Sequence, residues 1–159
     1  MIPRNLYDSD HEMFRDSLRK FIETEAMPHH EQWEKDGMVS DEIWLKAGEQ
    51  GFLCPMIPEE YGGVGTDFLY NCIVNEEIGR SGCTGLGWTL HNDITVPYIV
   101  RYGSEEQKQK YLPRCITGEL ITAIAMTEPG AGSDLQGTNT TAVLDGDHYI
   151  LNGSKTFIT

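Results

Sequence analysis

The chain has 159 residues, of which 39% are hydrophobic, and this length and composition fit one ordinary globular domain or two small ones. Twelve basic residues against twenty-five acidic ones give a formal net charge of −13, which would repel a nucleic-acid backbone. No run approaches the roughly eighteen apolar residues of a membrane span, and the N-terminus has neither a signal nor a transit pattern. We therefore expect no nucleic-acid partner and no membrane span, with a cytoplasmic location or, for a processed eukaryotic protein, the mitochondrial matrix.

The first predicted element is an amphipathic helix that ends at Pro28. Ser9 and Glu12 have the spacing of a capping box at its start. Apolar residues then repeat at helical intervals, at Phe14, Leu18, Phe21 and Ile22.

A second, shorter helix is predicted to begin at Ser40, with Gly51 in the left-handed conformation that often ends a helix. Its buried side should carry Ile43, Trp44 and Ala47. The stretch LCPMIPEEYGGVGT, residues 53–66, is typical of a loop.

Two further helices are predicted over residues 66–80 and 84–102, the second ended by Gly103. Residues 84–102 are the more apolar, so we expect that helix to be buried. Trp88, Leu90, Ile94 and Tyr98 on it are candidates for the wall of an apolar pocket, with plain core packing as the alternative. The last predicted helix begins at Ser104, where Gln107 completes a capping box.

After Gly118 the pattern changes to β-branched and aromatic residues, which predicts antiparallel strands at LITAIAM, TNTTAVL, HYIL and KTFIT. Asp145-Gly146 and Asn152-Gly153 are turn pairs between them. We predict an α+β chain: an all-α helical domain over residues 1–118, followed by the start of an antiparallel β domain over 119–159. Because a few strands with open edges are not stable alone, we expect more chain to belong to this domain.

Cysteine and histidine patterns give no metal site. Cys54, Cys72, Cys83 and Cys115 are far apart and form no CxxC pair, so we expect reduced, buried thiols. Neither His-Glu pair is followed by the second histidine of an HExxH motif.

The segment AIAMTEPGAGSDLQG, residues 123–137, is unusually rich in loop residues. A dinucleotide fingerprint would need glycine where Leu135 stands, and no Gly-Lys-Ser/Thr element of a P-loop exists. Glycines nevertheless let backbone N–H groups approach a ligand closely. From composition alone, a ligand-binding loop and an ordinary surface loop both stay open.

AMTEPGAGSD followed by NGSKTFIT resembles the paired signature of the flavin-dependent acyl-CoA dehydrogenases, and the whole chain is most similar to their long-chain branch. The resemblance implies a helical domain, a middle β domain and a C-terminal helical bundle that is absent from this chain. It also implies one FAD per subunit and a homotetramer. Phe157 stands where many members of the family have tryptophan.

The resemblance further implies the roles of individual residues. Residues predicted to contact FAD are Ile124, Ala125, Met126, Thr127, Glu128, Pro129, Gly130, Ala131, Gly132, Ser133, Phe157, Ile158 and Thr159. Ser133 is also expected to touch the CoA part of the substrate. Glu128 is interpreted as fixing the loop, because the family's catalytic base comes from sequence beyond Thr159.

The function implied is α,β-dehydrogenation of medium- or long-chain acyl-CoA thioesters, with electrons passed to an electron-transferring flavoprotein. One alternative is an acyl-CoA oxidase on the same fold, which oxygen consumption would reveal. Another is a truncated, non-catalytic binding or interaction module. Alone, this chain is predicted to be inactive, because it holds no base and only part of the β domain.

Overall fold

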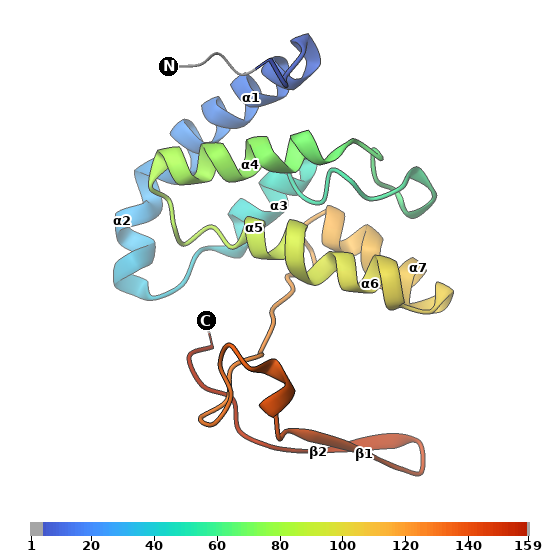
Figure 1. The fold of residues 1–159 in the computed structure, drawn as a ribbon. Coiled ribbons are helices and arrows are strands. Elements are labelled where there is room, and N and C mark those ends of the chain that lie inside the picture. The colour runs from blue at the N-terminus through green and yellow to red at the C-terminus, as the bar shows by residue number, and fades with distance from the viewer. Residues whose placement is uncertain (1–4, 159) are drawn as a thin grey trace. The chain divides into compact units, whose positions relative to one another are not determined.

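The structure, a computed structural model, describes residues 5–158. Two compact units divide between Thr122 and Ala123, the first helical and the second containing a β-hairpin (Figure 1). The α+β class and its order, helices first and antiparallel strands after, are confirmed. The predicted domain limits at residues 118 and 119 stay a prediction.

The first predicted helix is longer than expected. It comprises α1, Ser9–Phe21, a π-helical turn over Ile22–Ala26, and α2, Met27–Asp36. The prediction that it ends at Pro28 is wrong: this proline falls in the first turn of α2, directly after the π-turn, where a missing N–H is tolerated.

The predicted capping box of α1 is displaced by one residue. The cap is Asp8, whose carboxylate accepts the Asp10 and His11 N–H groups, and the Asp8 N–H points at His11 Nδ1. An aspartate paired with histidine replaces the expected Ser9–Glu12 pair, because a carboxylate one residue earlier competes for the same free N–H groups.

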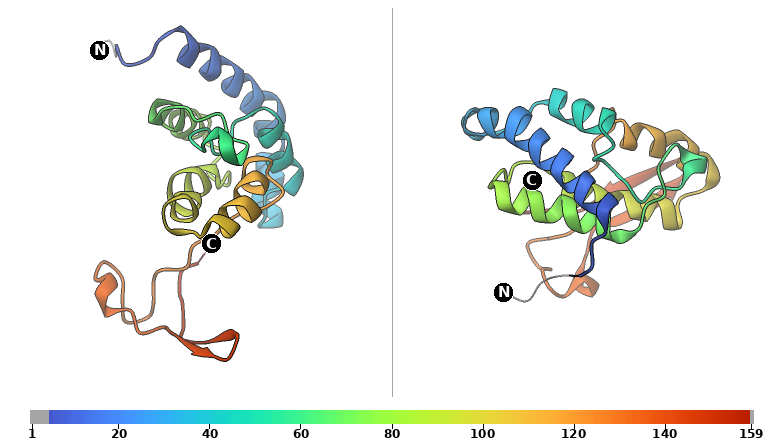
Figure 2. Two further views of the ribbon diagram at one scale, coloured as in Figure 1. Left: turned by 90° about the vertical axis from the view of Figure 1, so that its right-hand side faces the viewer. Right: turned by 90° about the horizontal axis from the view of Figure 1, so that it is seen from above.

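The next two helices agree with the sequence. α3, Asp41–Glu49, is capped by Ser40, and Gly51 has φ +74°. α4, Phe68–Ser81, begins at an Asp67 cap and packs across α1 (Figure 2). Between them, the loop contains a single 3-10 turn over Glu59–Tyr61.

The helix predicted over 84–102 begins only at Trp88. It consists of α5, Trp88–Leu90, a π-helical turn, His91–Thr95, and α6, Val96–Tyr102. The expectation that it is buried is wrong for one face, which leaves Tyr102 69% exposed. α7, Glu105–Ile116, follows with the predicted Ser104–Gln107 capping box formed in both directions.

Among residues 5–122, two apolar clusters hold the helical unit together. The larger joins α1, α3, α4 and α5 around Trp44 and Trp88. The smaller contains Cys54, Val96 and Cys115. All four cysteines are free, and all are buried except Cys72, which is half-buried. Burial raises the pKa of Cys115 to about 11, so this thiol stays protonated at neutral pH.

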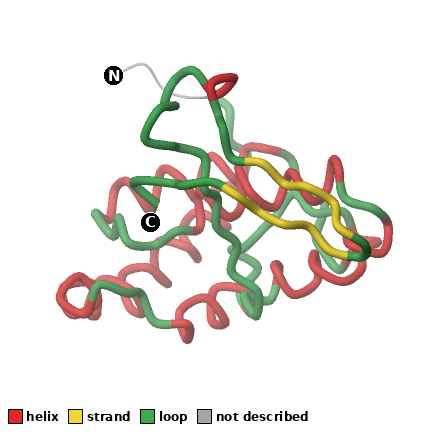
Figure 3. The backbone as a smooth tube through the Cα atoms, turned by 90° about the horizontal axis from the view of Figure 1, so that it is seen from below, coloured by secondary structure: helices red, strands yellow, loops and turns green. Residues whose placement is uncertain are grey.

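The second unit contains one antiparallel hairpin, β1, Thr141–Asp145, and β2, His148–Asn152 (Figure 3). Its turn centres on Gly146, at φ +65°, and Asp147, one residue later than the predicted pair. The strands predicted at LITAIAM and KTFIT are wrong for the described residues, which form loops there. A strand needs a partner ladder, whereas KTFIT is joined here by a single backbone hydrogen bond, from the Thr156 N–H to the carbonyl oxygen of Thr127, the residue after LITAIAM.

Candidate functional site

The loop that the sequence singled out is organised around one carboxylate. Glu128 is 6% exposed and accepts three hydrogen bonds. The Asn139 N–H donates to Oε2 over 2.7 Å, while the Thr140 N–H and the Lys155 Nζ donate to Oε1 over 3.0 and 2.9 Å. Its side chain therefore joins three stretches of chain that are distant in sequence.

These contacts fix the protonation state of Glu128. Hydrogen bonds from Thr140, Asn139 and Lys155 lower its pKa to about 2, against the opposing effect of burial. The carboxylate is ionised at neutral pH, and its oxygens face donors of the same chain. A group in this state is a poor acceptor for a substrate proton.

Lys155 makes a second contact, donating from Nζ to the Met126 carbonyl oxygen over 2.9 Å. The adjacent Thr156 N–H donates to the Thr127 carbonyl oxygen over 3.0 Å. The segment before Phe157 is thereby tied to the loop at Met126–Glu128. The structure thus brings together the two segments that the sequence assigned to one site.

A tight turn follows Glu128 in the loop. The Glu128 N–H donates to the Ala131 carbonyl oxygen over 2.9 Å, and the Ala131 N–H donates back over 3.1 Å. Pro129 and Gly130 form the tip between them. A Cβ at Gly130 or Gly132 would meet no atom within 4 Å, so open space lies beside both glycines.

Phe157 is the most unusual residue of the site. Its φ of +54° lies in the left-handed region, which costs a non-glycine residue on the order of 1 kcal/mol. The residue is 93% exposed, and Ile158 and Met126 are 43% and 42% exposed. An apolar ring held outward in a strained conformation forms a surface suited to a flat apolar ligand.

The remaining predicted residues differ in exposure. Glu128 and Ala131 are buried, whereas Ile124 and Thr127 are half-buried. The others that the structure describes are exposed: Ala125, Met126, Pro129, Gly130, Gly132, Ser133, Phe157 and Ile158. Thr159 lies outside the described residues.

Sequence reasoning missed three contributors to this site, Asn139, Thr140 and Lys155. The first two act through backbone N–H groups, which no side-chain pattern reveals. The glycine at position 153 is a possible signal of a close contact between segments. A Cβ added there would lie 2.1 Å from Thr140 Oγ1. The lack of a side chain permits this close approach, and Lys155 follows two residues later.

The chain enters the loop from an anchored residue, Thr122. His91 Nε2 lies 3.0 Å from the Cys115 carbonyl oxygen and donates to it, so His91 Nδ1 accepts from the Thr122 hydroxyl over 2.8 Å. Burial lowers the pKa of His91, which favours this neutral form. Thr122, the last residue of the helical unit, is held in place at neutral pH.

The four candidates for an apolar pocket do not share one surface. Trp88 is fully buried in the core, whereas Ile94 and Tyr98 are 41% and 55% exposed. These last two border a groove of about 310 Å³ together with Pro97 and Tyr102. Trp88 is therefore a core residue rather than part of that groove.

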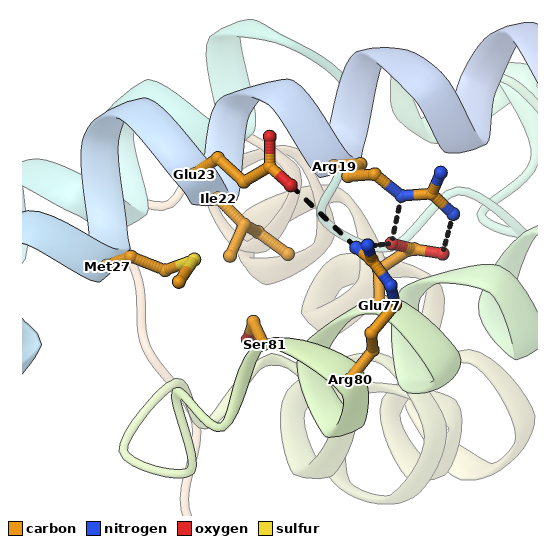
Figure 4. A pocket seen from close by; sticks show the side chains of 7 residues that line it. All are labelled: Arg19, Ile22, Glu23, Met27, Glu77, Arg80 and Ser81. Atoms are coloured by element: carbon orange, nitrogen blue, oxygen red, sulfur yellow. Dashed lines mark hydrogen bonds and ion pairs between the residues drawn. The ribbon is translucent and has the colours of Figure 1, made fainter.

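A smaller pocket of about 190 Å³ lies between α1 and α4 (Figure 4). Arg19 and Glu77 form a double hydrogen bond across it, with Nε to Oε2 and Nη2 to Oε1 both 2.9 Å. Arg80 lies 3.6 Å from Glu77 and 3.8 Å from Glu23. The charges that line this pocket pair with one another, which indicates a structural network.

Residues 5–158 contain neither a candidate membrane span nor a candidate metal site. No helix there is both long and apolar enough to cross a membrane. No group of three or more histidine, cysteine, aspartate or glutamate side chains within the same range is placed to hold a metal ion.

Two family models match the chain: acyl-CoA dehydrogenase, N-terminal domain, over residues 8–119, and acyl-CoA dehydrogenase, middle domain, over residues 123–159. The chain is 55% identical over 156 residues to the mitochondrial long-chain specific acyl-CoA dehydrogenase of Sus scrofa. That match covers 98% of this chain but only 36% of the relative.

Solved structures agree with these matches. An acyl-CoA dehydrogenase from Geobacillus kaustophilus superposes with a TM-score of 0.93 at 58% identity, over 98% of this chain and 41% of that one. An acyl-CoA dehydrogenase complexed with FAD from Bacillus anthracis has a TM-score of 0.90 at 39% identity, over 99% of this chain and 28% of that one.

Proposed function

The chain belongs to the acyl-CoA dehydrogenase family, and on that premise we propose that residues 124–133 and 157–158 hold FAD in an enzyme that desaturates acyl-CoA thioesters. The observation that carries the proposal is the exposed, left-handed Phe157 fixed beside the glycine loop. The FAD named for the Bacillus anthracis relative supports the same cofactor.

The chemistry of the exposed groups fits a flavin. An isoalloxazine ring has a flat apolar face and a polar edge, and the site offers an aromatic ring beside hydroxyl and backbone donors. Phe157 and Ile158 suit the face, while Thr127 and Ser133 suit polar edges or the phosphate-bearing tail. The open space at Gly130 and Gly132 allows the backbone to approach the cofactor.

FAD, when bound, supplies the acceptor for the β hydride, a role that no side chain can fill. The residues of this chain bind and orient it. Ser133 additionally contacts the CoA portion of the substrate. Glu128 is not the base that removes the α proton, because three donors engage its carboxylate and hold its pKa at about 2.

The proposed substrate is taken from a relative of this chain, and the proposed partners are taken from the family resemblance. The long-chain specificity named for the Sus scrofa relative supports a long-chain acyl-CoA substrate. The proposal includes electron transfer to an electron-transferring flavoprotein and a homotetrameric assembly, both implied by the family resemblance. The proposal assigns the base to no described residue of this chain.

The test is the variant Gly132→Val, made in a protein that contains this sequence and is as long as its relatives. Because nothing lies within 4 Å of a Cβ at Gly132, the chain's own packing should tolerate the valine, whereas the cofactor should not. We expect the variant to purify folded but without flavin absorption bands. The control is Gln136→Val, an exposed residue of the same unit outside the site. Normal flavin content in Gly132→Val would contradict the proposed site.

A further inference from the structure

Glu128 and Lys155 connect the two segments assigned to the flavin. Lys155 contacts both the carboxylate of Glu128 and the Met126 carbonyl oxygen, and lies two residues before Phe157. Glu128 lies inside the other segment. Together with the hydrogen bond from the Thr156 N–H to the Thr127 carbonyl, this contact ties the loop to the segment that carries Phe157.

The carboxylate also fixes the start of β1. The Asn139 and Thr140 N–H groups both point at it, and Thr140 packs against Gly153 so closely that no larger residue fits there. Lys155 follows Gly153 by two residues. Glu128 is thus linked to the Thr140 N–H, Thr140 lies against Gly153, and Lys155, two residues after Gly153, binds Glu128 in turn.

Among residues 123–158, little apolar packing supports this arrangement. Ala131 is the one buried apolar residue among the described residues of the second unit. Lys155 is 25% exposed, while the Glu128 side chain is 5% exposed. Within the described residues, the two segments are therefore joined by polar contacts. Most of them converge on the Glu128 side chain, beside the hydrogen bonds from Lys155 to the Met126 carbonyl and from the Thr156 N–H to the Thr127 carbonyl.

We propose that Glu128 is a positioning residue which, through Lys155 and the backbone of Asn139 and Thr140, sets the spacing of the two flavin-contacting segments. The inference rests on the proposed function. Neither side chain touches the reacting atoms, and the proposal assigns Glu128 no proton transfer. The carboxylate acts by holding the loop and the Phe157 segment in the relative arrangement from which both would contact the flavin.

The variant Glu128→Gln distinguishes a positioning role from the role of a base, because glutamine keeps the shape of the side chain but not its charge. Three donors converge on the carboxylate, and glutamine presents one acceptor oxygen and one NH₂ group that faces donors. We expect the variant to leave the helical unit folded and to weaken FAD binding at least about tenfold, as loss of a residue that orients metal ligands weakens metal binding. Asp147→Asn, a fully exposed carboxylate of the same unit, is the matched control and should bind FAD normally.

A double variant tests whether Glu128 and Lys155 act together. If they form one clamp, Glu128→Gln with Lys155→Met should weaken FAD binding no more than the worse single variant. In the protein freed of flavin, Glu128→Gln should also speed amide hydrogen exchange at Asn139 and Thr140, a readout independent of activity. Losses that add fully would overturn the clamp.

The experiment uses the protein at the full length of its relatives and measures FAD affinity and the rate of flavin reduction by a long-chain acyl-CoA. Weakened affinity with reduction largely kept in the flavin-bound fraction supports the inference. Unchanged affinity overturns it, and unchanged affinity with reduction abolished would make Glu128 the base. A wild-type protein that binds no flavin would overturn the proposed function, whereas wild-type binding with normal binding in Glu128→Gln overturns this inference alone.

Discussion

In the helical unit, two clusters of buried apolar side chains hold the helices together, with Trp88 and Leu18 fully excluded from solvent. In the unit after Thr122, both strands of the hairpin are exposed along their whole length, and the loop is held by contacts to Glu128. Apolar burial is non-directional and tolerant, whereas a polar clamp needs defined geometry. Within the described residues, the first unit is therefore held mainly by apolar burial and the second mainly by polar contacts.

The largest effect should come from the core of the helical unit. Trp88 is fully buried between Phe21 and Trp44, with ring centroids 6.1 and 6.4 Å away. Trp88→Ala should lower the free energy of unfolding by about 3–5 kcal/mol, because it leaves a large cavity. Urea denaturation followed by far-UV circular dichroism measures this. Tyr102→Ala, at a 69% exposed site, should change it by less than about 0.5 kcal/mol.

If Tyr102→Ala lowered the free energy of unfolding as much as Trp88→Ala does, the face of α6 that carries Tyr102 would be covered in the protein measured. A small loss in Trp88→Ala would remove the contrast between the two units. In that case the helical unit would not depend on apolar burial as described.

A medium effect is expected at the one buried carboxylate of α4. Glu77 has a 2% exposed side chain and pairs with Arg19 and Arg15. Glu77→Gln should cost about 2 kcal/mol, less than for a fully buried pair because Arg19 is 34% exposed. Asp16→Asn, exposed and 4.0 Å from Arg19, is the control and should have little effect.

The same residue predicts a pH dependence. Hydrogen bonds from Arg19 and then Arg15 lower the pKa of Glu77 below its ordinary value of 4.5, against the effect of burial. A lowered folded-state pKa stabilises the protein above the unfolded value, and this stabilisation is lost as the pH falls below about 4.5. Glu77→Gln should therefore unfold with a weaker dependence on acid than the wild type. An identical acid profile in both proteins would contradict the pairing.

The smallest effects compare glycines in the two units. A Cβ at Gly79 in α4 or at Gly146 in the hairpin turn would meet no atom within 4 Å, so only backbone preference differs. Gly79→Ala should stabilise the helical unit by about 0.5–1 kcal/mol, because alanine favours helices. Gly146→Ala should destabilise the hairpin by about 1 kcal/mol, because φ is +65° there. Hydrogen exchange of the hairpin amides measures the effect of Gly146→Ala. If both variants stabilised or both destabilised the protein, the left-handed conformation assigned to Gly146 would be contradicted.

Local signals in the sequence predicted local structure well. The Ser40 cap and the Ser104–Gln107 box depend on residues within one turn, and both formed as predicted. The Asp8–His11 box was missed because histidine is outside the usual capping pattern. The π-turn that carries the helix through Pro28 has no sequence signature of its own.

Strand pairing and contacts between residues far apart in sequence could not be predicted from such local signals. Ile124 and Phe157 lie in β-rich sequence but form no strand, since strands are defined by their partners. The paired motifs around Gly130 and Lys155 indicated one site. That Glu128 would be engaged by Asn139 and Thr140 through the backbone required the structure.

The most direct test of the account is amide hydrogen exchange of the full-length protein with and without FAD. We predict slower exchange with FAD in peptides that cover residues 124–133 and 155–158, and no change at the hairpin turn, residues 145–148, or in α4. Unchanged exchange in both predicted segments, with protection elsewhere, would contradict the claim that these segments form the cofactor surface.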